Sequence, residues 1–148
     1  MPYEFRMTHR VHFSETDMAG IVHFANFFRY MEATEHAFFR SLGFSIHTVE
    51  EGKTYGWPRV HVDCDYKQPL RFEDLVEVEL RVREKKSKSL SYSFLFRKLT
   101  DGEPVEVASG HITAVCVAMD GESGRMRAVD IPERLAAAIE VAPDVDAP

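Results

Sequence analysis

With 148 residues, of which 45% are hydrophobic and 28% charged, the chain has the size and composition of one globular domain with its own core. Its net charge of −6 argues against a nucleic acid partner, because no surplus of Lys and Arg exists to neutralise a phosphate backbone. No apolar run approaches the roughly 18 residues that a membrane span needs, so we expect no membrane insertion.

The N-terminal residues and the cysteines indicate the cellular compartment in which the protein is expected. The first ten residues are charged and lack the apolar stretch of a secretory signal. The two cysteines, Cys64 and Cys116, lie in apolar segments, and nothing else suggests a disulfide framework. Buried free thiols are typical of a reducing environment, so we expect a cytoplasmic protein.

One long helix is predicted after an N-terminal strand. Residues 3–13 alternate in polarity as a half-buried strand does. The helix is predicted from Ala25 to Leu42 and is ended by Gly43. Its polar stripe consists of Arg29, Glu32, His36 and Arg40, and its apolar band includes Phe27, Phe28, Met31, Phe38, Phe39 and Leu42. A band this wide needs a large apolar surface, which a sheet curled around the helix would supply.

The rest of the chain is predicted to form mainly strands. Residues 44–56 are of mixed polarity and are interpreted as a connection. Alternating polarity predicts strands within 57–67, 76–83 and 90–96. Asp101-Gly102 predicts a hairpin turn, and a longer strand is predicted from Val105 to Met119. A loop at 121–124 and a short helix from Pro132 to Val141 follow.

These elements predict an α+β fold with a single domain over residues 1–140. Strands joined largely by short turns favour antiparallel pairing, here in a five-stranded sheet that wraps one long central helix. Residues 141–148 are expected to form a disordered tail. Because the sheet must have edge strands, a dimer that extends or covers it is expected.

Several familiar catalytic motifs are missing from the sequence. Gly121-Glu-Ser-Gly has the wrong spacing for a G-x-S-x-G elbow, and neither G-x-G-x-x-G nor a P-loop occurs. The seven histidines show no paired ligand spacing, and C-x-x-C is absent. We therefore expect neither a metal nor a cofactor.

The remaining candidate site is Glu15-Thr16-Asp17, with Gly20, shortly before the helix begins. A carboxylate beside a helix N-terminus can attack a carbonyl, or activate water against it, while unpaired backbone N–H groups hold the carbonyl oxygen. The residues alone equally allow a structural role, in which Asp17 binds backbone donors of its own loop and Asn26 caps the helix.

The stretch DMAGIVHFANF from Asp17 to Phe27, followed by an aromatic-rich helix, closely resembles the 4-hydroxybenzoyl-CoA thioesterase family. The likeness continues in Asp74, in the basic turn before Ser89 and in Arg125-x-Arg127-Ala-x-x-Ile-Pro, and it covers residues 5–135. It implies a hotdog fold, with active sites built between two protomers of a dimer or a dimer of dimers.

The resemblance also implies roles for residues of the loop and the first helical turn. Asp17 would be the catalytic carboxylate, and Gly20 would let the backbone turn close to the substrate. The backbone N–H groups around His23 and Phe24 would polarise the thioester carbonyl. The imidazole of His23 departs from the aromatic or aliphatic residue usual at this place, so packing and contact with the acyl group both stay open.

The resemblance also assigns residues to the acyl group and to the CoA part of the substrate. Glu32 and Trp57 would meet the acyl group. The alternatives are a pair of Glu32 with His36 or Arg29, and packing of Trp57 in the core. The cations for the CoA phosphates would be Lys86, Lys88, Arg125 and Arg127, although charged turns are usually only solvated.

The expected function is hydrolysis of a small acyl- or aroyl-CoA to CoA and free acid. One alternative is a hotdog hydratase or dehydratase of enoyl thioesters, which would need an acid and base pair such as His23 or His36 with Glu32. The other is a non-catalytic module that binds acyl-CoA or acyl-carrier protein, in which Asp17 is structural.

Overall fold

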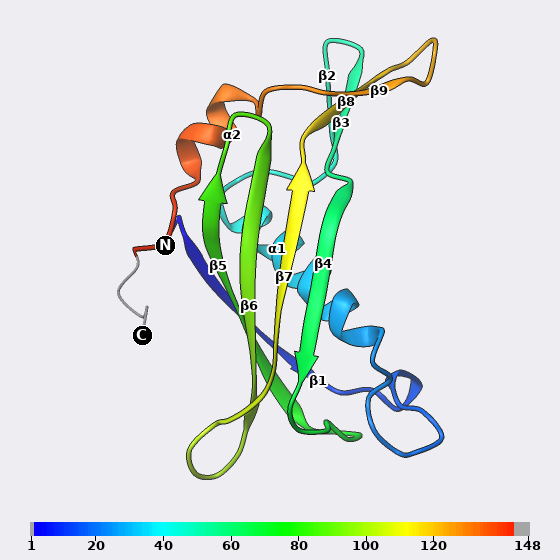
Figure 1. Cartoon of the computed structure of the whole chain (residues 1–148), viewed down its shortest axis with the longest axis vertical. Helices are drawn as coiled ribbons and strands as arrows, with labels where there is room; N and C mark the ends of the chain where they lie inside the picture. The colour runs from blue at the N-terminus through cyan, green and yellow to red at the C-terminus, as the bar shows by residue number, and fades with distance from the viewer. Residues whose placement is uncertain (1, 144–148) are drawn as a thin grey trace.

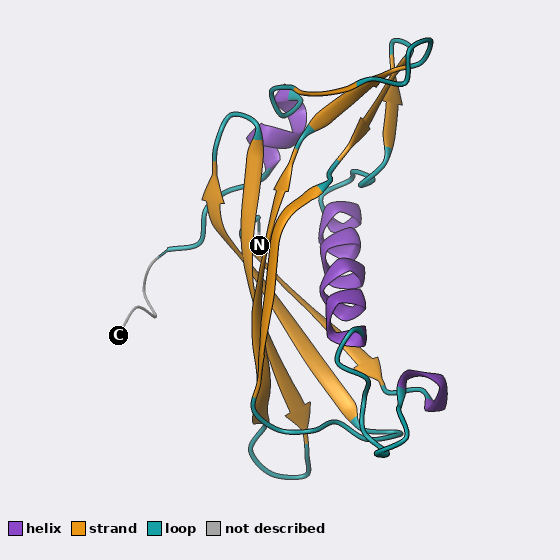
Figure 2. Ribbon diagram, turned by 45° about the vertical axis from the view of Figure 1, so that its right-hand side comes forward, coloured by secondary structure: helices purple, strands orange, loops and turns teal. Residues whose placement is uncertain are grey.

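The protein is described by a computed structural model that covers residues 2–143. Its centre is the helix α1 (Asn26–Ser41), which packs on an antiparallel sheet with the strand order β1-β5-β6-β7-β4. The strands are β1 (Glu4–Arg10), β4 (Arg59–Tyr66), β5 (Leu75–Lys85), β6 (Ser89–Leu99) and β7 (Val105–Val115). Figure 1 shows the strands fanning over α1, and Figure 2 shows the helix along one face of the curved sheet. The predicted α+β architecture is confirmed.

The core lies between α1 and the sheet. Alternate residues of β5 and β6 face the helix and are buried, namely Val76, Val78, Leu80, Val82, Leu90, Tyr92, Phe94 and Phe96. Met31, Phe38 and Phe39 of the helix are fully buried against them. Gly110 of β7 permits this approach, because a Cβ atom there would lie 2.6 Å from Met31 Cε. The helix therefore sits closer to the sheet than a side chain at position 110 would allow.

The spatial order of the strands differs from their order in the chain. β5, β6 and β7 form a meander, but β4 pairs with β7 and not with β5, which follows it. A loop at 67–74 therefore crosses from one sheet edge to the region beside β1. There it packs under the loop before α1, where the Val22 N–H donates to Leu70 O at 2.8 Å. β1 and β4 are left as the two edge strands.

A second, four-stranded sheet projects beyond the end of the first. It shows that the sequence predictions for residues 44–56 and for the long strand from Val105 to Met119 were wrong. Its strands are β2 (Thr48–Glu50), β3 (Lys53–Gly56), β8 (Val117–Asp120) and β9 (Met126–Ala128), in the order β2-β3-β8-β9. The segment 44–56 is thus more than a connection. The long strand predicted to Met119 is interrupted at Cys116, whose N–H donates to Lys88 O at 2.7 Å. Of these strands, β2 and β9 are mostly exposed and lack the apolar alternation that reveals a strand in sequence.

The C-terminal helix α2 (Glu133–Ala138) is shorter than the predicted helix over 132–141. Of the predicted tail, residues 144–148 lie outside the described residues. Ala142 is buried, and its N–H donates to Val82 O at 2.8 Å, so this part of the segment is docked on β5. Both cysteines are free thiols, as predicted, with Cys116 buried and Cys64 half-buried. Within residues 2–143, no helix has the length and apolarity to cross a membrane.

Candidate active site

The loop between β1 and α1 is closed like a small hairpin. After a 3-10 turn, η1 (Phe13–Glu15), Thr16 and Val22 form an isolated antiparallel bridge. Inside it, the Asp17 N–H donates to Ile21 O and the Gly20 N–H donates to Asp17 O, each at 2.9 Å. Gly20 has a φ of +79°, which L side chains rarely adopt, although a Cβ there would meet nothing within 4 Å. The backbone turn itself therefore requires glycine at this position.

The Asp17 carboxylate is only partly used by this loop. Its Oδ1 atom accepts the Ala19 N–H at 2.9 Å and the Ile21 N–H at 3.5 Å. Within residues 2–143, Oδ2 has no hydrogen bond partner. The side chain is exposed. Asp17 thus fills the structural role that the sequence allowed and still presents a free carboxylate oxygen.

The start of α1 leaves one backbone amide free. The His23 N–H donates to Glu15 O at 2.9 Å, and the Ala25 N–H donates to His23 Nδ1 at 3.2 Å. Asn26 does not cap the helix, because its Nδ2 atom donates to Glu15 O at 2.8 Å. Among the described residues, the Phe24 N–H has no acceptor. Of the two amides predicted to polarise a carbonyl, that of His23 is occupied and that of Phe24 is available.

Asp17 and Phe24 line the same pocket, which has a volume of about 500 Å³. Its other walls are Ile21, Val22, Phe27, Tyr66, Lys67, Gln68, Pro69 and Leu70. The walls are mainly apolar, as is usual for sites that bind small molecules. Asp17, with its free carboxylate oxygen, and Phe24, with its free backbone amide, therefore line one pocket, whose volume suits a small acyl group.

Tyr66 is a residue of this pocket that sequence reasoning missed. Its hydroxyl donates to Phe24 O at 3.0 Å, and its ring meets Phe27 edge-on, with 5.0 Å between centroids. In the sequence it is the last apolar position of an alternating strand, which indicates only core packing. Its place at the end of the edge strand β4, followed by Lys-Gln-Pro, is the signal that it borders a loop.

The acid and base pairs that a hydratase would need, His23 or His36 with Glu32, do not form in the described chain. The His23 ring stacks on Phe24, with 4.6 Å between centroids, and its Nδ1 atom accepts the Ala25 N–H. His36 lies 4.0 Å from Glu35 and makes no ion pair with Glu32 in the described chain. Across residues 2–143, no cluster of His, Cys, Asp and Glu has an arrangement that could hold a metal ion.

Glu32 and Trp57 line a second pocket, of about 340 Å³, together with His36 and Arg59. Trp57 is 9% exposed and also packs edge-on against Phe39, so it contributes to the core as well as to this pocket. Glu32 Oε2 lies 3.7 Å from Arg59 Nη2. The pairs of Glu32 with His36 or Arg29, which were the alternative to a contact with the acyl group, do not form in the described residues, and Glu32 lies near Arg59 instead.

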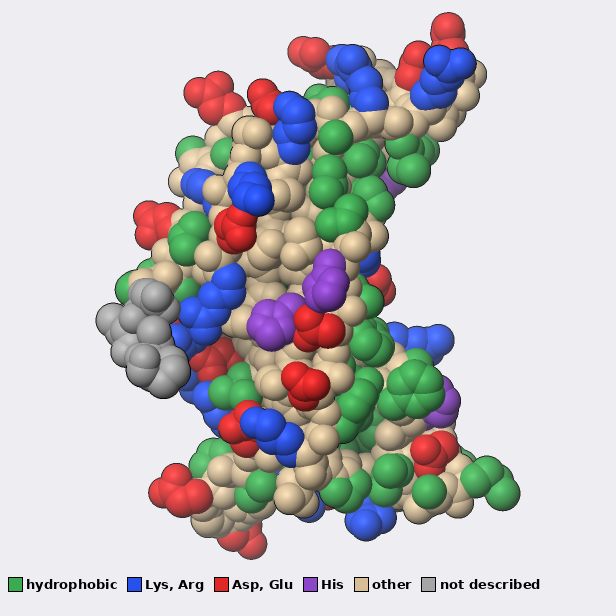
Figure 3. Space-filling view, in the orientation of Figure 1, with side chains coloured by type: hydrophobic (Ala, Val, Ile, Leu, Met, Phe, Trp, Pro, Cys, Tyr) green, Lys and Arg blue, Asp and Glu red, His purple; other side chains and the backbone are tan. Residues whose placement is uncertain are grey.

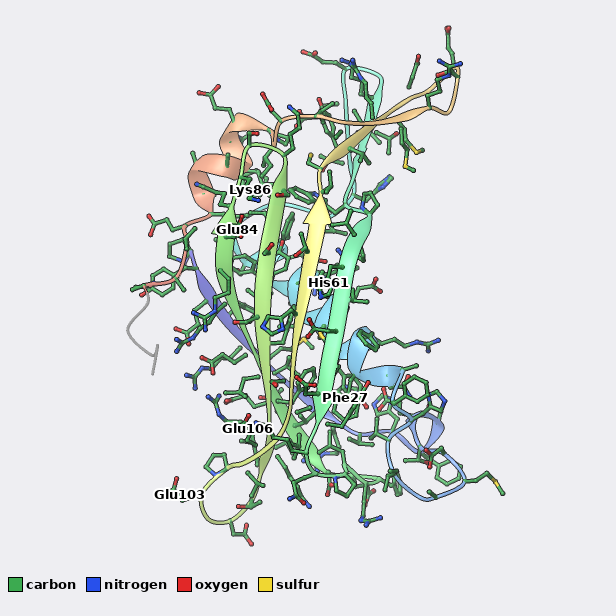
Figure 4. All side chains as sticks on the ribbon, viewed as in Figure 1. Phe27, His61, Glu84, Lys86, Glu103 and Glu106 are labelled. Carbon is green, nitrogen blue, oxygen red and sulfur yellow. The ribbon has the colours of Figure 1, made fainter. Side chains whose placement is uncertain are left out.

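The four basic residues lie at the opposite end of the molecule from Asp17. Lys86 pairs with Glu84 at 2.9 Å, near the turn between β5 and β6 (Figure 4), and Lys88 pairs with Asp130 at 2.6 Å. Arg125 and Arg127 line a groove of about 610 Å³. Arg127 belongs to β9, whose place in the chain is shown in Figure 1. Asp17 lies in the loop 11–25, which leads into the N-terminal end of α1, far from these basic residues. The helix has 16 residues and is thus about 24 Å long. One protomer therefore does not bring its predicted phosphate-binding residues to its own Asp17.

Known proteins are similar to this chain in sequence and in fold. Residues 11–139 match the model of the thioesterase-like superfamily. The chain is 34% identical over 124 residues to a putative esterase of Aquifex aeolicus (strain VF5), covering 82% of this chain and 89% of that protein. It is 28% identical over 135 residues to the 4-hydroxybenzoyl-CoA thioesterase of Pseudomonas sp. (strain CBS-3), covering 89% and 94%.

A solved structure shows the same fold at low sequence identity. It is that of a 4-hydroxybenzoyl-CoA thioesterase mutant in complex with 4-hydroxybenzoyl-CoA, which superposes with a TM-score of 0.81 at 21% identity. The match covers 93% of this chain and 99% of the other. The fold and the family that the sequence predicted are therefore both confirmed. The chain belongs to the thioesterase-like superfamily and is a thioester hydrolase of the hotdog fold.

Proposed function

We propose that the protein hydrolyses a small acyl- or aroyl-CoA to CoA and free acid, with the Asp17 carboxylate as nucleophile or general base. The observation that carries the proposal is the shared pocket of Asp17 and Phe24. Asp17, which has a free carboxylate oxygen, and Phe24, which has a free backbone amide, lie in one loop and line this pocket together. These are the two groups that attack on a carbonyl needs, one to deliver the nucleophile and one to hold the oxygen.

The chemistry follows from these two groups. The thioester oxygen would accept the Phe24 N–H, at the positive end of the α1 dipole, and gain charge there as the carbonyl is attacked. Asp17 would either add to the carbonyl carbon, which expels the CoA thiolate and leaves an anhydride for water to cleave, or take a proton from the attacking water. Because a thiolate leaves readily, a site with one carboxylate and no partner acid suffices.

A second protomer would complete the site. Val60 and Val62 on the edge strand β4 are 63% and 44% exposed, and hydrophobic side chains gather along this edge of the molecule in Figure 3. An exposed apolar edge strand is a surface for pairing with another chain. Antiparallel pairing of two β4 strands would place the far end of the partner, with its basic residues, beside Asp17. A dimer is thus the smallest complete unit, and a dimer of dimers is compatible with it.

This arrangement assigns the remaining predicted residues. The pocket of Glu32 and Trp57 would receive the end of the acyl group, and its mixed polar and aromatic lining suits a ring that carries a hydroxyl group. Lys86, Lys88, Arg125 and Arg127 would hold the phosphates of CoA. The relative from Pseudomonas is named for an aroyl-CoA of this kind.

The test compares the wild type with Asp17→Asn on a panel of acyl- and aroyl-CoAs, with a thiol reagent to report CoA release. Asp17→Asn should lower kcat by about 10²- to 10⁴-fold, the range for loss of a general base. Asp101→Asn, in the exposed β6–β7 loop, is the matched control and should not change kcat. Release that survives Asp17→Asn unchanged would refute the mechanism.

The same panel addresses the alternatives. A protein that binds acyl-CoAs and releases thiol from none of them would be a binding module. Water addition to an enoyl-CoA without thiol release would indicate a hydratase. The geometry offers that reaction little support, because His23 and His36 make no pair with Glu32 within the described chain.

A further inference from the structure

Glu15 is the residue at which the three segments around the candidate site are joined. Its main-chain oxygen accepts the His23 N–H at 2.9 Å and Asn26 Nδ2 at 2.8 Å, which ties the loop to the first turn of α1. Its carboxylate accepts the His12 N–H at 2.7 Å, and His9 Nε2 of β1 lies 2.9 and 3.1 Å from its two oxygens. One residue therefore links the sheet, the 3-10 turn and the helix.

These contacts are partly shielded from water. The side chains of His9 and Glu15 are 22% and 19% exposed, and the His9 ring packs on Tyr30, with 4.7 Å between centroids. Burial by itself would raise the pKa of Glu15, but the hydrogen bonds from His12 and His9 outweigh it and hold this pKa below its usual value. The carboxylate is thus charged and held in place, as an anchor requires.

The anchor acts directly on the two groups of the proposed mechanism. Glu15 and Thr16 form the first stem of the small hairpin, and Asp17 is the next residue. Glu15 O also accepts the His23 N–H. The next backbone amide, that of Phe24, is therefore the free donor at the start of the helix within the described residues. A shift of Glu15 would therefore change the distance from the Asp17 carboxylate to the Phe24 N–H.

We propose that Glu15 is a positioning residue, which with His9 sets the relative placement of the Asp17 carboxylate and the Phe24 amide. This inference rests on the proposed role of Asp17. Glu15 does not line the pocket of Asp17, so its contribution is to geometry and not to substrate contact. A misplacement of reacting groups by about 1 Å can cost about 100-fold in rate.

The test is a double-mutant cycle of position 15 with Asp17, measured on the acyl-CoA that the wild type hydrolyses fastest. Glu15→Ala should lower kcat by about 10- to 100-fold and change KM by less than about threefold. Glu15→Gln keeps an acceptor for the His12 N–H but loses the charge, so its kcat should lie between those of Glu15→Ala and the wild type. In an Asp17→Asn background, neither substitution should lower the residual rate further.

The control is Glu103→Gln, because Glu103 projects from the β6–β7 loop away from the site (Figure 4). It should leave both kcat and KM unchanged. If Glu15→Ala proves unfolded in urea titrations, the cycle is run with Glu15→Gln alone. A wild-type kcat in the folded Glu15 variants, or an equal fall in both backgrounds, would overturn the inference. An active Asp17→Asn protein would instead refute the proposed function.

Discussion

Arg59 and Glu35 form a two-pronged ion pair inside the protomer. Arg59 Nη1 lies 3.0 Å from Glu35 Oε2, and Nη2 lies 2.6 Å from Oε1. The Glu35 side chain is fully buried on α1, whereas Arg59 is the first residue of the edge strand β4. Arg59 Nη1 also donates to Trp57 O at 3.2 Å. The pair thus fastens the edge strand to the helix at the pocket that Glu32 and Trp57 line.

Removing one partner of this pair should destabilise the fold strongly. Arg59→Ala leaves the Glu35 carboxylate buried without its cation, and breaking a buried pair in this way costs about 3–5 kcal/mol. Urea unfolding of the variant measures the loss. The control is Lys86→Ala, whose surface pair with Glu84 is worth about 0–1 kcal/mol (Figure 4). Equal losses in the two variants would show that the Glu35 pair is not a structural anchor.

The stability of the protein should fall in acid through Glu79. Burial raises the pKa of this carboxyl group, but its hydrogen bonds and the charges of Arg97 and Arg6 outweigh burial and lower the pKa from 4.5 to about 2. The ion pairs therefore stabilise the folded state fully above pH 4.5, and this stabilisation is lost as the pH falls towards 2.

Glu79→Gln tests this acid dependence. It removes charged hydrogen bonds worth about 1–3 kcal/mol at pH 7, so the free energy of unfolding should drop by about that amount. The difference from the wild type should shrink between pH 4.5 and the lowest pH at which the wild type folds. Urea titrations at several pH values measure it, and a difference independent of pH in this window would contradict the assignment.

The hydroxyl of Tyr66 should support catalysis by holding Phe24. Tyr66→Phe keeps the ring against Phe27 and removes the hydroxyl that donates to Phe24 O, a hydrogen bond worth about 1 kcal/mol. We expect kcat/KM to fall by about 3- to 10-fold and the free energy of unfolding to fall by about 1 kcal/mol or less. Tyr55→Phe, on β3 and outside this pocket, is the control for loss of a phenol oxygen. A wild-type kcat/KM in Tyr66→Phe would show that the hydroxyl does not matter.

Sequence patterns predicted the structural features that depend on residues close together in the chain. The predicted helix Ala25–Leu42 differs from α1 by one residue at each end, because its apolar band and Gly43 are local signals. The loop with Asp17 and Gly20 was the candidate that remained after other motifs were set aside, and the family resemblance favoured a catalytic role for Asp17 over a structural one. β2, β3 and β9 were missed because strands of three or four residues are too short to show an alternation of polarity.

The remaining features depend on contacts between distant positions. Nothing in the sequence pairs Glu35 with Arg59, which lies 24 positions away, or places β4 beside β7. The amide of His23 was expected to be free, but the path of the loop brings Glu15 O within 2.9 Å of it. Such hydrogen bonds follow from the folded backbone, so a motif can name the residues of a site and still misassign one of its donors.

A final prediction tests whether two protomers share each active site. If Asp17 works with the basic residues of its partner, a chain with Asp17→Asn and a chain with Arg125→Ala and Arg127→Ala should complement each other in a mixed dimer. One of the two sites in that dimer would have the wild-type residues at all three positions. In a random mixture, half of the dimers are mixed, so about a quarter of all sites should regain wild-type activity.

Co-expression of the two chains with different tags, followed by purification on both, isolates the mixed dimer for assay. The control pairs Asp17→Asn with a chain that carries all three substitutions, from which no wild-type site can form. If one protomer supplied every residue of its own site, the mixed dimer would show only the mean activity of the two parent variants. Activity well above that mean is expected, because the Asp17 pocket and the Arg125 and Arg127 groove lie at opposite ends of each chain.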